Sequence, residues 1–196
     1  SITKANVETL HTKLKEYEAS YETILYLGEL GFSTKDSMII YNTYKAKTKQ
    51  IIEEDIYKLI YDIIDINFKK IDQIALNMRI EKDSLIRIKA SLIYIMTEVS
   101  NTYGHSYYFY EELTSLLPRV LGVTITTELF DQALIELKKD LKIVVKEEKF
   151  YLKDMYDAET LIVKRLRLLE KNPITTSKHI DDKIKDLEDF YGIIYN

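Results

Sequence analysis

The sequence predicts a mainly helical fold, with two helix–short turn–helix units in tandem followed by a small α+β domain that contains a β-hairpin. Three observations predict it. Apolar residues recur at steps of three and four along most of the 196 residues. Only 5 Gly and 2 Pro interrupt the chain, which argues against turn-rich all-β architectures. Near residue 148, two short apolar runs flank a charged stretch, as the strands of a β-hairpin do.

The tandem units are predicted in the first 80 residues. Gly31 is expected to end the first helix, and Ser33 is the expected N-cap of the second. Asp65-Ile66-Asn67 separates the third helix from the fourth, and the basic stretch 45–49 joins the two units. The apolar spacing places the four helices at residues 10–28, 34–44, 52–63 and 68–78.

The character of the sequence changes after the fifth helix, which Asp83 is expected to cap. A short Tyr-rich strand, two helices, a hairpin and a closing helix follow. This order is that of a winged helix-turn-helix, although a generic α+β domain has the same elements. Residues 172–196 are predicted to be a linker. The elements of this domain are expected at residues 85–99, 105–110, 111–121, 127–141, 143–145, 150–152 and 154–170.

Composition excludes several classes of function. The sequence has no Cys and contains neither GxxxxGK[ST] nor GxGxxG, so thiolate chemistry and a nucleotide-binding loop are not expected. The three His lie far apart in sequence, and no metal site is predicted. No apolar run is long enough to span a bilayer, and a cytosolic location is expected. We therefore expect no catalysis from these residues.

Binding is the better-supported kind of function, although the formal net charge is −4. Residues 33–50 and residues 67–89 each carry a charge of +3. A turn that leads into a helix N-terminus exposes amide N–H groups, and nearby lysines help it to hold a backbone phosphate. A solvated lysine-rich face explains the same excess. The charges of the predicted hairpin are balanced, which suits contact with protein as well as with DNA.

The tyrosines of the predicted short strand also have two interpretations. Tyr107, Tyr108 and Tyr110 form a cluster that could stack on nucleic-acid bases. Tyrosines that are half-buried in a strand are the more common explanation of such a cluster.

Several motifs, in this order and spacing, resemble the region that precedes the motor in RecD-like DNA helicases of the RecBC-independent class. The resemblance covers about residues 20–170. It rests on Phe32-Ser33, Ile40-Tyr41-Asn42-Thr43-Tyr44, Ile56-Tyr57-Lys58-Leu59, Asp62-Ile63, Ile66-Asn67-Phe68-Lys69-Lys70-Ile71-Asp72-Gln73-Ile74-Ala75, Arg87-Ile88-Lys89-Ala90, Gly104-His105-Ser106-Tyr107 and Ala158-Glu159.

The resemblance implies an N-terminal helix plus tandem helix-hairpin-helix units over residues 1–82, a winged-helix-like domain over 83–171 and a linker over 172–196 toward an absent helicase motor. It implies that the parent protein is an ATP-dependent 5′→3′ DNA helicase of repair or recombination that uses ATP and Mg²⁺. The expected partners are single-stranded or forked DNA, the parent's own motor domains and other replication or repair proteins, and no membrane.

One departure from the family pattern concerns the second hairpin, where Asp65-Ile66-Asn67 stands in place of Gly-x-Gly. Asn tolerates the left-handed backbone that the turn requires, whereas Asp65 places a carboxylate beside the expected phosphate. The candidate DNA contacts are Lys45, Lys47, Asn67, Lys69 and Lys70. Two hypotheses follow: a DNA-guiding region with weak backbone contacts, or a protein-interaction and regulatory module of the same helicase that does not bind DNA.

Overall fold

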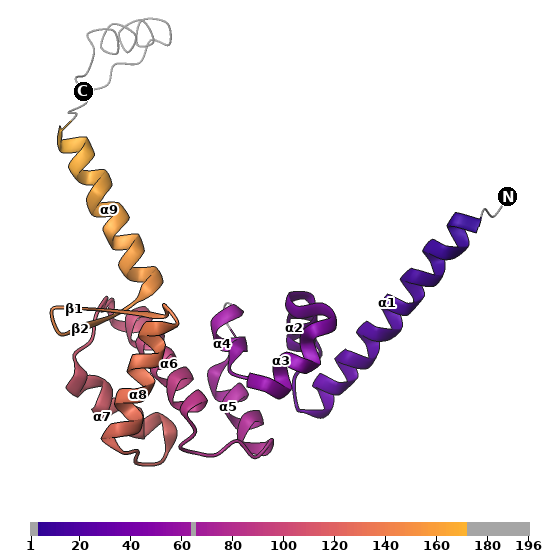
Figure 1. Cartoon of the computed structure of the whole chain (residues 1–196), viewed down its shortest axis with the longest axis horizontal. Coiled ribbons are helices and arrows are strands. Elements are labelled where there is room, and N and C mark those ends of the chain that lie inside the picture. The colour runs from indigo at the N-terminus through magenta and orange to yellow at the C-terminus, as the bar shows by residue number, and fades with distance from the viewer. Residues whose placement is uncertain (1–3, 64–65, 172–196) are drawn as a thin grey trace, which may run out of the picture. The chain divides into compact units, whose positions relative to one another are not determined.

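The computed structural model describes residues 4–63 and 66–171, and these are mainly helical (Figure 1). The residues up to Lys153 form one compact unit. The last described helix, α9 (Lys153–Lys171), lies almost wholly in a second unit and is described by itself. The linker predicted over 172–196 lies outside the described residues.

The first helices agree closely with the predicted tandem units. Ser33 caps α2 as expected, because its hydroxyl accepts a hydrogen bond from the Asp36 N–H at 3.1 Å. The helix before it ends at a turn in which Gly31 has φ +105° and the Phe32 N–H donates to the Leu27 carbonyl. The elements of this half are α1 (Lys4–Glu29), α2 (Thr34–Tyr44), the short 3₁₀ helix η1 (Lys45–Lys47), α3 (Thr48–Asp55), α4 (Lys58–Asp62) and α5 (Phe68–Asn77).

The single helix predicted over 52–63 is wrong, because the structure divides it into α3 and α4. The Asp55 carboxylate accepts a hydrogen bond from the Tyr57 N–H at 2.9 Å, which ends α3. Tyr57 is fully buried, and its hydroxyl donates to Asp72 of α5 at 2.6 Å. The break therefore allows Tyr57 to reach a partner 15 positions along the chain.

The second half also follows the predicted order, with two corrections. Ser84, not Asp83, occupies the N-cap position of α6. The strand predicted over 105–110 is reduced to one bridge, in which Tyr108 pairs with Phe150 of the hairpin. The elements are α6 (Leu85–Tyr103), α7 (Tyr110–Leu121), α8 (Thr127–Lys139), β1 (Ile143–Lys146) and β2 (Lys149–Leu152), with the two strands antiparallel.

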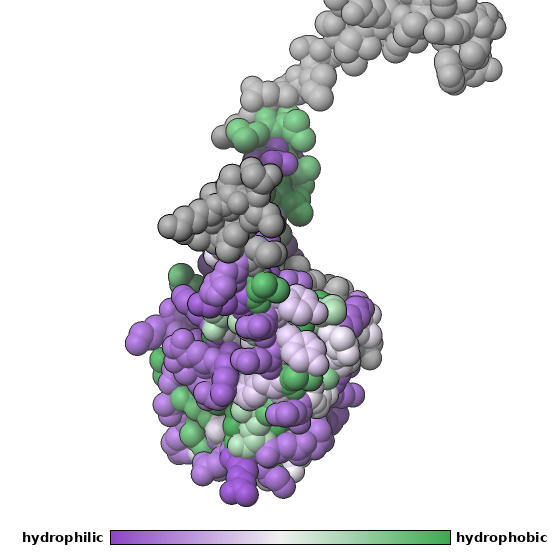
Figure 2. Space-filling model, turned by 90° about the vertical axis from the view of Figure 1, so that its right-hand side faces the viewer, coloured by the Kyte–Doolittle hydropathy of each residue, from purple (hydrophilic) through white to green (hydrophobic). Residues whose placement is uncertain are grey.

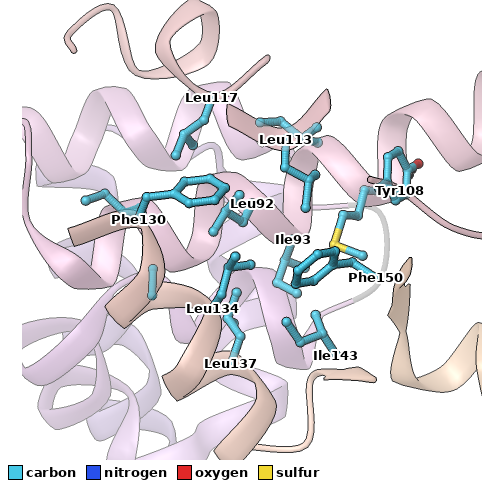
Figure 3. Close-up of a cluster of buried hydrophobic side chains, with 14 of the residues drawn as sticks. Leu92, Ile93, Tyr108, Leu113, Leu117, Phe130, Leu134, Leu137, Ile143 and Phe150 are labelled. Atoms are coloured by element: carbon cyan, nitrogen blue, oxygen red, sulfur yellow. Dashed lines mark hydrogen bonds between the residues drawn. The ribbon is translucent and has the colours of Figure 1, made fainter. Parts of the chain in front are cut away.

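Each half has its own cluster of buried apolar side chains. The first cluster joins α1 to α5 and includes Leu27, Ile40, Tyr57 and Ile71. The second joins α6, α7, α8 and the hairpin, and Figure 3 shows its side chains converging from these elements. Its labelled members are Leu92, Ile93, Tyr108, Leu113, Leu117, Phe130, Leu134, Leu137, Ile143 and Phe150.

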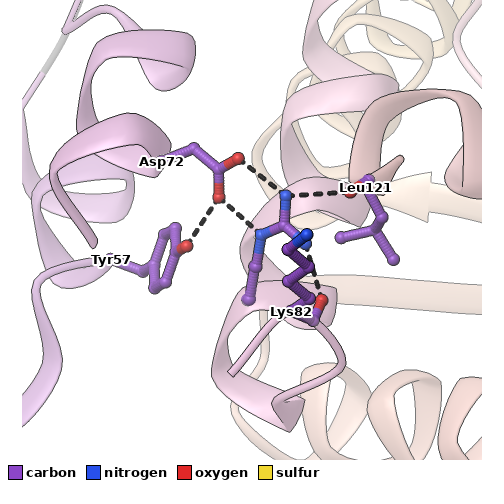
Figure 4. Close-up of polar contacts among 5 residues, drawn as sticks. Tyr57, Asp72, Lys82 and Leu121 are labelled. Atoms are coloured by element: carbon purple, nitrogen blue, oxygen red, sulfur yellow. Dashed lines mark hydrogen bonds and ion pairs between the residues drawn. The ribbon is translucent and has the colours of Figure 1, made fainter. Parts of the chain in front are cut away.

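A buried ion pair connects the two halves (Figure 4). Arg87 of α6 is 2% exposed and contacts Asp72 of α5 through two hydrogen bonds, of 2.8 and 2.9 Å. The same guanidinium donates to the carbonyl oxygens of Lys82 and Leu121. The hydrogen bond to Asp72 raises the pKa of Arg87 above its usual range. Arg87 therefore holds α5, α6 and the end of α7 together.

Two further properties of the described residues bear directly on function. Within the described ranges 4–63 and 66–171, no helix is long and apolar enough to cross a membrane. The same residues contain no group of three or more His, Asp or Glu side chains placed to hold a metal ion.

Candidate functional site

The N-termini of α2 and α5 meet and are built alike. Ser33 caps α2, and Asn67 caps α5 by accepting a hydrogen bond from the Lys70 N–H at 3.1 Å. Asp36 and Lys70 are the third residues of their helices, and they form an ion pair of 2.8 Å. We call residues 33–36 together with residues 67–70 the paired N-termini.

The paired N-termini present unused amide donors. The first backbone bonds of the two helices are Ser37 N–H to the Ser33 carbonyl and Ile71 N–H to the Asn67 carbonyl. The N–H groups of the two residues after each cap have no acceptor within the helix. The second of those residues is a lysine in both helices, and Lys35 and Lys69 are both exposed. Unused amides, the positive ends of two helix dipoles and two lysines together favour an anion.

The turn between α1 and α2 packs against α5. Gly31 has φ +105°, a backbone conformation that L side chains rarely adopt. A Cβ atom at this position would lie 3.8 Å from Cγ1 of Ile74, so the turn lies against α5. This packing sets the start of α2 beside the start of α5.

Charge at the paired N-termini remains positive after the ion pair is taken into account. Hydrogen bonds from Lys70 and then from Ser33 hold the pKa of the Asp36 carboxyl below its usual range. Asp36 is therefore an anion at neutral pH and compensates one lysine. Lys35, Lys69 and Lys70 against Asp36 leave a local charge of +2.

The left-handed turn expected at Asn67 is not present. Asn67 has φ −75° and ψ 106°, an extended conformation, and acts as a helix cap. Its side-chain oxygen takes the Lys70 N–H, one of the amides that would otherwise be open to a phosphate. Asp65 lies outside the described residues.

Among the five candidate contacts, the structure brings together Asn67, Lys69 and Lys70 but not the other two. Lys45 and Lys47 lie in η1, at the opposite end of α2 and about 14 Å along its axis from Asp36. The Lys45 ammonium donates to the side-chain oxygen of Asn42 at 2.8 Å and lies over the Tyr41 ring. Lys45 and Lys47 therefore form a separate basic site.

Sequence reasoning missed Lys35 as a contact candidate. Its signal was its position, because it follows a polar cap by two residues, as Lys69 does. Whereas Lys35 and Lys69 are distant in sequence but equivalent in position, Lys69 and Lys70 are adjacent in sequence but differ in their surroundings. Lys69 is exposed, and Lys70 is half-buried in its ion pair with Asp36.

Apart from the paired N-termini, a cavity of about 240 Å³ lies where α4 and α6 approach the end of α8. Burial opposes the charge of Lys89 there, but hydrogen bonds to Asp140 and Glu136 raise its pKa above the usual value. The Lys142 ammonium lies over the Tyr61 ring. Asp55, Asp62 and Asp140 also line the cavity, so its three lysines face three carboxylates. The paired N-termini are therefore the stronger candidate for an anion site.

Hydrophilic side chains predominate on the face of the chain that Figure 2 shows, and hydrophobic residues appear there in small separate areas.

In a comparison with family models, residues 16–107 match the model described as the HHH (helix-hairpin-helix) domain of the ATP-dependent RecD2 DNA helicase. The matched range contains the whole of α2 to α6 and both paired N-termini.

Proposed function

We propose that residues 16–107, which are a RecD2 DNA helicase HHH domain, engage DNA through its phosphate backbone. The observation that carries the proposal is the pair of capped helix N-termini, each with an exposed lysine at its second position. Unused backbone amides donate hydrogen bonds to phosphate oxygens and make no contact with the edges of the bases. The contact is therefore independent of DNA sequence and weakens with salt.

Within this proposal the contacts have unequal weight. Lys35 and Lys69 neutralise phosphates directly, and the first amides after Asn67 and Ser33 orient them. Lys70 contributes less because Asp36 neutralises it. Lys45 and Lys47 make a second contact at the other end of α2, on a further phosphate of the same backbone.

The proposal includes the remaining elements. Residues 1–82 form the helix-hairpin-helix region, residues 83–171 a winged-helix-like domain, and residues 172–196 a linker toward the motor. The order α6, bridge, α7, α8, hairpin supports the winged-helix description. The whole region guides single-stranded or forked DNA toward a motor that hydrolyses ATP with Mg²⁺, in repair or recombination. Its own role is non-catalytic.

A second candidate function is a protein-interaction or regulatory module of the same helicase that does not bind DNA. The observation that favours it is charge compensation: Lys70 is paired with Asp36, and Lys89 with Glu136 and Asp140. The hairpin likewise carries Glu147-Glu148 between two lysines. The partner would be the parent's own motor domains or another replication or repair protein.

Titration of the chain against labelled duplex, single-stranded and forked DNA at several salt concentrations separates the two functions. DNA contact predicts a linear fall of log affinity with log salt, with a slope of about 0.9 per phosphate on duplex and about 0.7 on single strands. Absence of binding at low salt would overturn the DNA-engaging function and favour the protein-interaction module.

A further inference from the structure

Between α6 and α7 the chain is extended, and its aromatic side chains alternate between core and surface. Tyr108 is 2% exposed, exchanges two backbone hydrogen bonds with Phe150, and donates its hydroxyl to the Met96 carbonyl at 2.7 Å. Successive side chains of an extended segment point to opposite faces. Tyr107 and Phe109 therefore point outward, and they are 37% and 41% exposed.

The hairpin adds to the same outward face. Phe150 of β2 is buried, so its neighbours Lys149 and Tyr151 lie on the other side of the strand. The ring centroid of Tyr107 lies 5.9 Å from that of Tyr151 and 5.6 Å from that of Phe109. The Lys149 ammonium lies 4.5 Å from the Tyr107 ring centroid. We call Tyr107, Phe109, Tyr151 and Lys149 the aromatic platform.

A hollow of about 250 Å³ adjoins the platform. Tyr107 and Phe109 supply its aromatic walls, and Gly104 opens one side, since it has no side chain. Lys146 lies directly opposite Lys149 across the two strands, so two cations share this face with the rings. His105, Ser106 and Glu112 complete the lining of the hollow. Two exposed rings, the adjoining hollow and two lysines form a surface that the apolar core does not explain.

We propose that the aromatic platform stacks on the bases of unpaired DNA. Every base has a flat π-face, so rings on an exposed surface bind single strands without sequence preference, and adjacent lysines follow the backbone. The proposal rests on the proposed DNA-engaging function and adds a second mode of contact to it. The paired N-termini hold phosphates of any strand, whereas the platform requires bases that are free to leave a duplex.

The test compares two labelled oligonucleotides of equal length by fluorescence anisotropy with the full chain. One is oligothymidylate, and the other has abasic residues throughout, so the two have the same phosphates and differ only in their bases. The chain is expected to bind oligothymidylate about five-fold or more tightly than the abasic strand. Tyr107→Ala should remove most of this preference and leave affinity for the abasic strand unchanged, whereas Tyr107→Phe should keep it.

Tyr17→Ala is the matched control, because Tyr17 lies on α1 and is 71% exposed. Phe109→Leu, which keeps an apolar side chain without a ring, provides the same comparison if Tyr107→Ala does not fold by circular dichroism. Equal binding of both strands by the unmodified chain would overturn the platform and leave phosphate contact intact. An equal loss on both strands in Tyr107→Ala would also overturn it. No binding of either strand would overturn both proposals.

Discussion

Asp36 is the residue that sets how much charge the paired N-termini offer to DNA. It forms an ion pair with Lys70 and accepts a hydrogen bond from Ser33. Replacement by Asn removes the negative charge and keeps a side-chain oxygen that can accept the hydrogen bond from the Ser33 hydroxyl. Lys70 then becomes available to a phosphate.

Asp36→Asn is therefore expected to tighten duplex binding at low salt and to steepen the salt slope by about 0.9, the value for one further phosphate contact. Salt titrations of the variant and the unmodified chain measure both quantities. Glu16→Gln, an equal change of charge on exposed α1, serves as the control. An unchanged slope in Asp36→Asn would show that Lys70 does not reach the backbone.

Sequence analysis could not separate Lys69 from Lys70, because adjacent lysines in a basic stretch have the same pattern. Their difference depends on Asp36, 34 positions before Lys70, and on the packing of α2 beside α5. Lys35 was counted in the basic excess but not as a contact, because its equivalence to Lys69 becomes visible only when both caps are known. For single residues, the sequence therefore predicts that a site is rich in lysine better than it predicts which lysines belong to the site.

The turn of the β-hairpin places two successive non-glycine residues in the left-handed region of backbone conformation. Lys146 pairs with Lys149, so Glu147 and Glu148 form a two-residue loop, and both have positive φ, of 51° and 62°. This is a type I′ turn, which favours Asn-Gly because ordinary side chains are strained in the left-handed region.

Glu147→Asn combined with Glu148→Gly is expected to raise the free energy of unfolding by roughly 1 kcal/mol, because it relieves this strain. Urea denaturation followed by circular dichroism measures the change. Glu147→Gln with Glu148→Gln removes the same charges without relieving the backbone, and should leave stability nearly unchanged. An equal rise in the free energy of unfolding in both variants would mean that charge repulsion, not backbone strain, destabilises the turn.

Element order was predictable, whereas several element boundaries were not. The cap Ser33 and the terminating Gly31 carry local signals, and the structure confirms them. The break between α3 and α4 was missed because the apolar spacing continues through it. Its local signal is Asp55, whose carboxylate accepts the Tyr57 N–H. Its second contact, from Tyr57 to Asp72, joins distant parts of the sequence.

In the first unit, the contact between Asp72 and Arg87 links the two apolar clusters, which also share the partly buried Ile60, Tyr61 and Val120. Removal of one partner of a buried pair leaves the other charge without compensation. Asp72→Asn is therefore expected to lower the free energy of unfolding by about 3–5 kcal/mol. Tyr57→Phe, which removes one hydrogen bond to the same carboxylate, should cost about 1.5–3 kcal/mol, the range for bonds to charged groups.

Urea denaturation of both variants and the unmodified chain, followed by circular dichroism, measures these differences. A loss below 1 kcal/mol in Asp72→Asn would contradict the view that Arg87 depends on Asp72 for compensation. A second, separate transition in this variant would show in addition that the pair couples the unfolding of the two clusters.

The fold of the whole molecule could be predicted in outline and its candidate site only in part. Helical spacing and turn residues are local, so the tandem units and the hairpin could be read from sequence. The paired N-termini and the aromatic platform depend on which helix starts and strand faces come together. Asn67 shows the limit most clearly: the sequence predicts a left-handed turn residue, whereas the structure gives it an extended backbone and a helix-capping role.

Phosphate binding at the paired N-termini is tested by the variant Lys35→Glu with Lys69→Glu. The quantity to measure is the salt dependence of its binding to duplex DNA. Lys13→Glu with Lys15→Glu, an equal change of charge on exposed α1, is its control. We expect the first variant to bind more weakly at low salt and to lose about 0.9 from the slope for each lysine, roughly 1.8 in all, and the control to keep the original slope. Equal slopes in all three proteins would contradict phosphate binding at the paired N-termini.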